Sequence, residues 1–557
     1  MKVVKMGSLR KGRSRGEALS RRDILTFAGG MVAVAAFLTA PLLKYFGWLS
    51  SGTFKRQLVV PPLVGGMAGS DGTHFINLRV STGHAELIDG VRTRILCYND
   101  ASPGPTLAVR RGTAVTIRIE NSLREATTIH WHGAHLPGAR DGGPHNPIAA
   151  HAVLETNLVF EQAGATLWYH PHPMGRTGPQ VYGGLAGLLL LQDGEDERLG
   201  LPHHYGVDDF PLIIQDRRLD TSGQLLYRTS PSDMMGMKGN CFLVNGRQKP
   251  FVHVPAQWVR LRLINGSNAR LYNFGFADGR AFHVIAGDGG LLQDPVVMNT
   301  LLLAPAERAE IMVDLSLDLG RHLILRHLGV MELSGLSTMP TDFDNYDFTG
   351  VDLLKLKVGP KLNVSGTLPS KLADLPRPDV AGAAIRNFIM SDTIDMSASK
   401  APSEVVSDLA FAEKMGFPIC LKGNGTVPSD TPSGLASSGT AMTGTGMFLI
   451  NGKTMDLERI DQAVRLGTQE IWEIQNLSHM AHPFHIHGTS FRIIARNGVV
   501  PPDHEDGFKD VVLVLTNETV RVAVQFGQIA DKAAPYMFHC HNLEHGDDGM
   551  MGQFTVT

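Results

Sequence analysis

A ten-residue pattern that ends in asparagine occurs three times along the chain. The copies span residues 112–121, 256–265 and 467–476. In each copy alternate positions are apolar, which predicts a β-strand with one face toward a hydrophobic core. The repetition predicts three related β-domains, and a chain of 557 residues is also too long for one core.

The register of the three copies continues beyond the asparagine. Nine residues after the first and third asparagine come His-Trp-His (130–132) and His-Ile-His (485–487). Nine residues after the second asparagine comes Phe-Gly-Phe (274–276). The outer copies therefore place paired imidazoles where the middle copy places paired phenyl rings. This predicts metal ligands in the two outer domains and none at this position in the middle one.

The domains are predicted to span residues 54–200, 201–360 and 361–557. The chain has 61 glycines, and 43% of its residues are hydrophobic and 19% charged, which is typical of a globular all-β protein. The formal net charge of −3 gives no reason to expect a nucleic-acid partner or an anionic membrane surface. We expect a monomer.

Residues 1–53 are predicted to be a leader. Paired arginines at 21–22 precede the uncharged segment 24–43, which resembles a twin-arginine export signal. The alternative is a membrane anchor, but two glycines and a proline make the segment a poor one. We therefore expect export to the periplasm or another extracytoplasmic compartment, without stable membrane insertion. Whether the leader is removed or retained stays open.

Four clusters rich in histidine carry the chemical prediction. They are His130-x-His132, His170-x-His172, His482-x-x-His485-x-His487, and His539-Cys540-His541 followed by His545 and Met550. Residues i and i+2 of a strand point to one face, so each His-x-His presents two imidazoles side by side. The outer domains together supply eight such imidazoles, the number that one two-coordinate and two three-coordinate copper ions need.

Cys540 lies between two of these histidines. On a strand His539 and His541 face one way and Cys540 the other. A soft thiolate with two imidazoles and a weak methionine forms an electron-transfer site of the blue-copper type. An electron arriving there has a short through-bond path to the neighbouring imidazoles.

These motifs resemble those of the bacterial three-domain multicopper oxidases, in the branch of copper efflux (cuprous) oxidases and laccases. The matching motifs are His-Trp-His-Gly, Tyr-His-Pro-His, His-Pro-Phe-His-Ile-His-Gly and His-Cys-His-x-Leu-Glu-His. The resemblance implies three cupredoxin-like Greek-key β-barrels and four copper ions: one type 1, one type 2 and two type 3. It also implies one-electron oxidation of a small reducing substrate, coupled to four-electron reduction of dioxygen to water.

The resemblance also assigns the ligands. His130 and His485 hold the type 2 copper, and His482, Cys540 and His545 hold the blue type 1 copper. Met550 is its axial ligand, with Met551 as the adjacent alternative. The coupled type 3 pair is held by His132, His170, His172, His487, His539 and His541.

Asp141 matches a family aspartate that assists proton delivery, although an Asp-Gly pair is also a common turn. Close relatives often have a glutamate where this chain has Gly546. This departure puts a second proton path in doubt, unless Asp547 or Asp548 replaces it.

The substrate stays open between phenols or aromatic amines and Cu(I). Met480 matches one ligand of the cuprous site, and Asp395 and Met396 match others loosely. Ser478 stands where those enzymes usually have an aspartate, and residues 423–446, a predicted flexible loop, replace their methionine-rich helix. Bilirubin and Mn(II) are further possibilities.

Two smaller questions also remain. Some relatives with this fold have lost the copper ligands and serve structural roles in cell division, but all twelve ligand positions are present here. Cys97, Cys241 and Cys420 are predicted to be buried free thiols, although one pair could form a disulfide.

Overall fold

The computed structural model describes most of the chain after the predicted leader. The described residues are 54–65, 67–68, 74–229, 231–330, 350–363, 366–393 and 446–557. The leader, Asp395, Met396, Cys420 and nearly all of the predicted loop 423–446 lie outside them. No helix within these ranges is both long and apolar enough to span a membrane.

The first domain is built from two sheets. One has the order β1 (Leu63–Val64), β5 (Thr106–Arg110), β10 (Gly187–Gln192), β9 (Ala165–His170), β7 (His130–His132). The other has the order β2 (Met67–Ala68), β3 (His74–Ile88), β6 (Val115–Asn121), β8 (Val153–Leu158), with β4 (Val91–Tyr98) on β3. The helices are α2 (Gly138–Asp141), α3 (Thr177–Gly183) and α4 (Glu195–Leu199).

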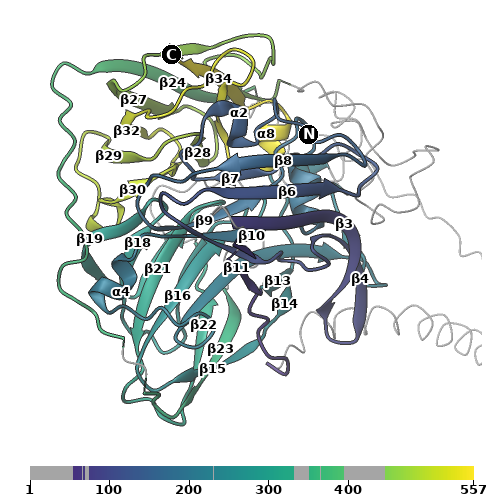
Figure 1. The fold of residues 1–557 in the computed structure, drawn as a ribbon, viewed down its shortest axis with the longest axis vertical. Helices are drawn as coiled ribbons and strands as arrows, with labels where there is room; N and C mark the ends of the chain where they lie inside the picture. The colour runs from purple at the N-terminus through teal and green to yellow at the C-terminus, as the bar shows by residue number, and fades with distance from the viewer. Residues whose placement is uncertain are drawn as a thin grey trace, which may run out of the picture. The chain divides into compact units, whose positions relative to one another are not determined.

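The middle domain repeats this plan (Figure 1). Its larger sheet has the order β14 (Arg247–Gln248), β13 (Cys241–Val244), β11 (Asp209–Leu219), β16 (Trp258–Asn265), β21 (Arg308–Asp314), β18 (Phe282–Gly287), β19 (Gly290–Met298), with β12 (Leu225–Leu226) on β11. The smaller sheet has the order β15 (Phe251–Pro255), β23 (Val351–Gly359), β22 (His322–His327), β17 (Tyr272–Phe276), β20 (Thr300–Leu303). A 3-10 helix, η1, spans Pro231–Met235.

The third domain again has two sheets. The first has the order β25 (Phe448–Ile450), β24 (Ala384–Asp392), β27 (Gln469–Asn476), β32 (Thr519–Gln525), β29 (Phe491–Arg496), β30 (Phe508–Lys509). The second has the order β26 (Gln462–Val464), β34 (Met551–Val556), β33 (Tyr536–Cys540), β28 (His482–Ile486), β31 (Val511–Val514). The helices are η3 (Asp503–Glu505) and α8 (Leu543–Asp547).

The three sequence repeats occupy equivalent strands. β6, β16 and β27 each pair in parallel with the long first strand of their domain, which is β3, β11 or β24. Each also pairs antiparallel with a later strand, which is β8, β21 or β32. The all-β architecture of three related domains predicted from the repeats is therefore confirmed.

The asparagine that ends each repeat stabilises the turn that follows it. The side-chain amides of Asn121, Asn265 and Asn476 donate to a backbone carbonyl four or five residues later, at 2.9, 2.7 and 2.8 Å. Their Oδ1 atoms accept from the backbone N–H two residues later, at 3.0, 3.1 and 3.0 Å. These bonds fix the turn after the strand, and so the nine-residue step to the next strand stays constant.

A second set of asparagines fixes another turn in every domain. Asn99, Asn245 and Asn451 have φ angles of 49°, 48° and 54°, a left-handed conformation that asparagine tolerates well. Each Oδ1 accepts from a backbone N–H of the domain's first long strand, at 2.7, 2.8 and 2.7 Å. The sequence shows this echo only in the last two domains, because Cys-Tyr-Asn-Asp in the first domain replaces Leu-Val-Asn-Gly and Leu-Ile-Asn-Gly.

Each domain has its own hydrophobic core. Phe274 and Phe276 are buried in the middle one, with 0% and 2% of their surface exposed. Cys540, Met480 and Met550 lie in the core of the third domain. Cys97 and Cys241 are buried free thiols.

Candidate copper sites

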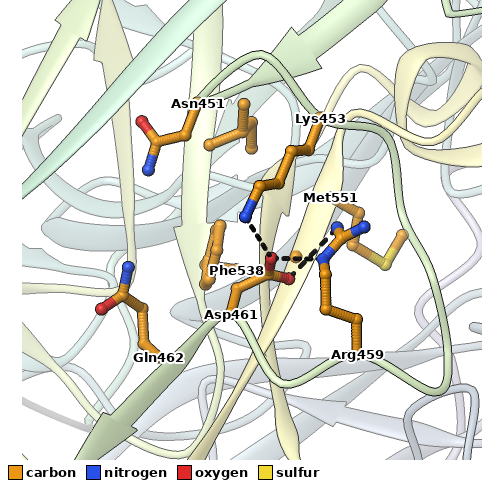
Figure 2. A pocket seen from close by; sticks show the side chains of 9 residues that line it. Asn451, Lys453, Arg459, Asp461, Gln462, Phe538 and Met551 are labelled. Carbon is orange, nitrogen blue, oxygen red and sulfur yellow. Dashed lines mark hydrogen bonds and ion pairs between the residues drawn. The ribbon is translucent and has the colours of Figure 1, made fainter.

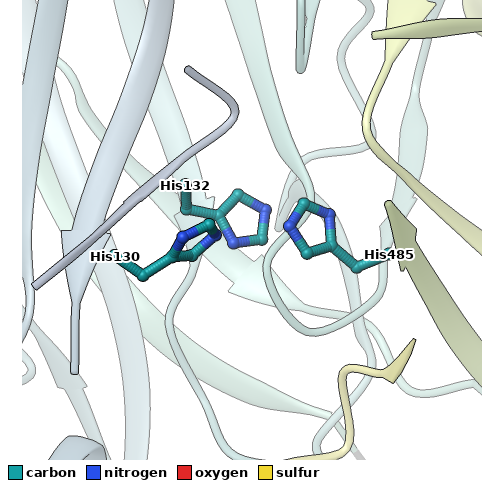
Figure 3. A group of neighbouring side chains, drawn as sticks. All are labelled: His130, His132 and His485. Carbon is teal, nitrogen blue, oxygen red and sulfur yellow. The ribbon is translucent and has the colours of Figure 1, made fainter. Parts of the chain in front are cut away.

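Eight imidazoles from the first and third domains meet at one place. The rings of His132 and His485 stack at a centroid distance of 3.9 Å, which brings β7 against β28. Figure 3 shows the side chains of His130, His132 and His485 converging. In each of two further groups the ligand atoms lie within 4.8 Å of one another: His132 with His170 and His541, and His172 with His487 and His539.

Three of the four His-x-His pairs divide their imidazoles between different groups, whereas His130 and His132 share one group. His170 ends β9 and His539 lies one residue before the end of β33, so His172 and His541 follow after their strands end. Only the pair on β7 lies wholly within a strand. The prediction that both rings of a pair face one site therefore holds only for the pair on β7. In the other three pairs the second histidine follows the end of its strand, and its ring lies in another group.

The nitrogen positions fit bound cations. His539 Nε2 lies 3.1 Å from Nε2 of both His172 and His487. The Nε2 atoms of His130 and His485 are buried and have no hydrogen-bond partner. Buried polar atoms are nearly always satisfied in folded proteins. Unsatisfied lone pairs that face common points are the arrangement that a copper cluster requires.

Burial also keeps seven of these imidazoles neutral. Desolvation lowers the pKa of His539 to about 4 and holds the pKa of the following histidines well below the usual value: His132, His170, His172, His485, His487 and His541. A neutral imidazole offers a lone pair to a metal without first losing a proton. The site is thus chemically prepared for metal at neutral pH.

A second, mononuclear donor set lies within the third domain. His482 Nδ1 lies 3.3 Å from Cys540 Sγ, His545 Nδ1 lies 3.5 Å from the same sulfur, and the two nitrogens are 3.2 Å apart. All three side chains are buried. Burial raises the pKa of the Cys540 thiol, so a thiolate there depends on a bound cation. Two imidazoles and one sulfur fit a trigonal copper site.

Met550 and Met551 lie in different surroundings. Met550 is 0% exposed and packs in the core that contains Cys540, and its backbone carbonyl accepts from the Cys540 N–H at 3.1 Å. Met551 instead lines a surface pocket with Lys453, Arg459 and others, as Figure 2 shows. This placement favours Met550 as the axial ligand.

Beside the mononuclear site, the hydroxyl of Ser478 is hydrogen-bonded to His482 Nε2 at 2.8 Å. Nδ1 of the same ring is thereby directed at Cys540. Met480 is 5% exposed and lies in the third-domain core that also contains Cys540. A neutral hydroxyl therefore holds the outer edge of this imidazole, at the position where the resemblance to cuprous oxidases implies an aspartate.

Asp141 joins the two outer domains at the cluster. Its Oδ2 accepts a hydrogen bond from His487 Nδ1 at 2.7 Å, and its backbone carbonyl accepts one from His130 Nδ1 at 3.0 Å. Its Oδ1 is buried and without a partner. The next residue, Gly142, has φ +81°, and a Cβ there would lie 1.7 Å from Ile129 O. Asp141 is thus the last residue of α2, ahead of a left-handed glycine, and also a contact of two predicted ligands.

Asp510, which the sequence reasoning missed, repeats this arrangement from the third domain. Its backbone carbonyl accepts from His485 Nδ1 at 2.7 Å, and its Oδ1 accepts from His132 Nε2 at 3.0 Å. Each aspartate therefore bonds one imidazole of its own domain through the carbonyl and one of the other domain through the carboxylate. No motif surrounds Asp510, and the matching bonds become visible only in three dimensions.

Gly546 lies close beside the cluster. A Cβ there would lie 3.3 Å from Cys540 O and 4.0 Å from His539 Nδ1. A longer side chain at this position would therefore start next to a predicted ligand. The Asp547 carboxylate is bound elsewhere, since it accepts from the backbone N–H groups of Thr177 and Gly178 at 3.0 and 2.8 Å.

Family models agree with this geometry in all three domains. Models described as multicopper oxidase match residues 79–196, 218–342 and 426–557. The chain belongs to the multicopper oxidase family. Membership of the multicopper oxidase family, as the motifs predict, is therefore confirmed.

Similar proteins include both oxidases and a cell-division protein. Multicopper oxidase mco of Staphylococcus haemolyticus is 32% identical over 91% of this chain and 94% of its own length. Cell division protein FtsP of Salmonella typhimurium is 34% identical over 90% of this chain and 93% of its own length. The solved structure of the laccase-like multicopper oxidase CueO from Ochrobactrum sp. superimposes with a TM-score of 0.74 at 35% identity, covering 90% of this chain and all of that one.

Proposed function

We propose that this multicopper oxidase is an active enzyme that oxidises a small substrate one electron at a time and reduces dioxygen to water. The observation that carries the proposal is that two complete, buried donor sets are present, one mononuclear and one of eight imidazoles. We assign one type 1 copper, one type 2 copper between His130 and His485, and two type 3 coppers. Bound copper supplies one-electron redox chemistry at both sites.

The chain itself connects the two sites. Cys540 belongs to the mononuclear group, and its covalent neighbours His539 and His541 belong to the eight-imidazole cluster. The peptide backbone between them is a continuous bonded path for electrons. The path is buried along its whole length, because all three side chains are at most 2% exposed.

Reduction of dioxygen to two waters consumes four electrons and four protons, and Asp141 is our candidate for proton delivery. Its Oδ2 orients His487, whereas Oδ1 has no hydrogen-bond partner and can hold and release a proton. Asp510 cannot do the same, because both of its carboxylate oxygens accept from Arg308. With Gly546 in place of a glutamate, Asp141 is the carboxyl group that we expect to matter most.

For the substrate we retain two classes. Phenols and aromatic amines are supported by the likeness to the Ochrobactrum enzyme, which has oxidase activity towards lignin model compounds and lignosulfonate. Cu(I) is supported by Met480, whose backbone N–H donates to the Ser478 hydroxyl that is bonded to His482, because a soft thioether ligand suits Cu(I). Steady-state oxidation of a phenol with and without excess copper separates them, since strong activation by copper indicates a retained cuprous site.

We also propose export by the twin-arginine route, on the strength of the paired arginines 21–22 before an uncharged segment. Replacing both with lysine should leave the protein in the cytoplasm, as measured by cell fractionation and immunoblotting. Periplasmic protein at the unmodified level would contradict this route.

Copper reconstitution of the purified chain tests activity directly. We expect four coppers per chain, an intense absorption band in the red and oxygen consumption with a phenol or Cu(I). A folded chain that takes up no copper and consumes no oxygen would instead favour a structural role like that of a cell-division protein.

A further inference from the structure

The middle domain carries no predicted copper ligand, yet one of its arginines reaches the cluster. Arg308, the first residue of β21, is 1% exposed. Its Nη1 donates to Asp510 Oδ1 at 2.7 Å and its Nη2 donates to Asp510 Oδ2 at 2.5 Å. Because Asp510 Oδ1 also accepts from His132 Nε2 at 3.0 Å, a chain of contacts links the middle domain to a predicted type 3 ligand.

Arg308 is held by all three domains. Beside Asp510 of the third domain it donates to the carbonyl of Thr166 of the first domain at 3.1 Å. Within its own domain it donates to the carbonyls of Ala306 and Asp288, at 3.1 and 2.9 Å. A guanidinium group has five N–H donors, and these contacts use every one. The side chain is thereby fixed in one orientation.

The His-Trp-His-Gly motif makes room for this ion pair. Gly133 has φ +86°, and a Cβ there would lie 2.6 Å from both Arg308 Nη2 and Asp510 Oδ2. Any side chain at this position would push the pair away from β7. The glycine after His132 thus allows the close approach on which the contact between His132 and Asp510 depends.

From these contacts we infer that Arg308 is a positioning residue for the copper cluster. By holding both oxygens of Asp510, it fixes the carboxylate that keeps the proton of His132 on Nε2. Nδ1 of the same ring is then free to face His170 Nε2, which lies 3.2 Å away. Outer partners of this kind set the tautomer and direction of a ligating imidazole. Lysine cannot replace arginine here, since an ammonium group does not bind a carboxylate bidentately.

The chain provides a matched control in Arg262 on β16. It is also a buried arginine of the middle domain, and it binds Asp209 in a bidentate fashion at 2.7 and 2.8 Å. It also contacts the first domain, through Thr166 Oγ1 at 2.9 Å. None of its side-chain partners is hydrogen-bonded to a predicted copper ligand, whereas Asp510, the partner of Arg308, is bonded to His132. If lysine substitution acts only by weakening the packing between domains, the Arg262 and Arg308 variants should both lose cluster copper. If it acts on the position of His132, only the Arg308 variant should lose it.

The test compares Arg308→Lys, Arg262→Lys and the unmodified full-length protein, each loaded with copper. We expect cluster copper to be lost from Arg308→Lys at a chelator concentration about 10–100-fold lower than from the unmodified protein. The red absorption band of the mononuclear site should persist. Arg262→Lys should lower the melting temperature but keep the unmodified chelator resistance. Equal loss of cluster copper from both variants, or none from Arg308→Lys, would overturn the inference.

A second readout needs no copper and so separates this inference from the proposed function. Nitrogen-15 NMR of the metal-free protein should show His132 protonated on Nε2, and Arg308→Lys should populate the other tautomer. If Arg308→Lys does not fold, Asp510→Asn, which keeps the side-chain volume, serves in its place. An unchanged tautomer together with unchanged chelator resistance in Asp510→Asn would refute the positioning role. Failure of the unmodified protein to bind cluster copper would refute the proposed function instead.

Discussion

Strand β17 of the middle domain and strands β7 and β28 of the outer domains have equivalent places in their sheets, but only the outer two carry imidazoles. In each case the strand pairs with a later one: Phe274 lies opposite His327, His130 opposite His170, and His485 opposite His539. Phe274 is fully buried in a hydrophobic core, and the two histidines face the cluster.

The difference teaches that the fold and the metal site are specified separately. The alternation of apolar residues and the terminal asparagine fix the strand and its register in all three domains. The identity of two side chains then decides whether that register supports a core or a copper cluster. The middle domain contributes to the cluster from another strand, through Arg308 on β21.

The largest effect is expected from replacing Cys540, the predicted copper-ligating thiol, which only the third domain supplies. Cys540→Ser should abolish the red absorption band and reduce oxidase activity to background, because the mononuclear site loses its thiolate and its bonded path. The fold should survive, as circular dichroism can show. The control is Cys241→Ser, which removes a buried free thiol of the middle domain and should keep both colour and activity. A blue Cys540→Ser protein would refute the assignment.

Giving an outer domain the side chains of the middle one is the next test. The double substitution His485→Phe and His487→Phe should eliminate cluster copper and oxygen reduction, since it removes ligands from two of the three groups. The mononuclear site should still bind copper and be reduced by substrate. Copper analysis and stopped-flow absorbance measure the two effects. Retained oxygen consumption would show that the cluster does not depend on this register.

Asp141→Asn should have a smaller effect, a decrease in turnover of about 10–100-fold. Electrons would still reach the mononuclear site but would wait for protons, so the reduced fraction of blue copper at steady state should rise. Gly546→Glu should partly restore turnover, because a side chain there begins 4.0 Å from His539 Nδ1. If the blue copper stays oxidised while turnover falls, Asp141 supports substrate oxidation or structure and not proton delivery.

The smallest effect is expected from the reverse exchange, Phe274→His. A buried imidazole without a partner should lower the free energy of unfolding by about 1–3 kcal/mol, as chemical denaturation can measure. It should create no copper site, because the later strand supplies Leu328 and Gly329 after His327 where the outer domains supply further ligands. Additional bound copper in this variant would mean that a single residue decides whether a domain binds copper at this position.

Much of the architecture could be predicted from the sequence, because its signals are local. The alternating strands and the asparagine turns are each determined by about ten consecutive residues, and the predicted ligands occur in short motifs. Geometry at the ends of strands could not be predicted in this way. His172 and His541 follow after the ends of β9 and β33, and only the path of the chain beyond the sheet decides which group receives their imidazoles.

The contacts around the ligands were also beyond sequence reasoning. Arg308 and Asp510 are 202 residues apart in the chain, and no spacing rule connects them. Asp510 also accepts from His132, which is 378 residues away from it in the chain. Such pairs arise from the packing of one domain on another, which depends on all three folded surfaces together.

The division of the cluster between distant parts of the chain also sets an order in time. The first-domain imidazoles, at positions 130–172, are synthesised early, whereas β33 and α8, with Cys540 and His545, are synthesised only after the first two domains. Until then the chain holds neither a mononuclear site nor a bonded electron path. Under the proposed function, a polypeptide that stops before β33 would be unable to pass electrons to oxygen, and oxidase activity would require the third domain to pack on the first.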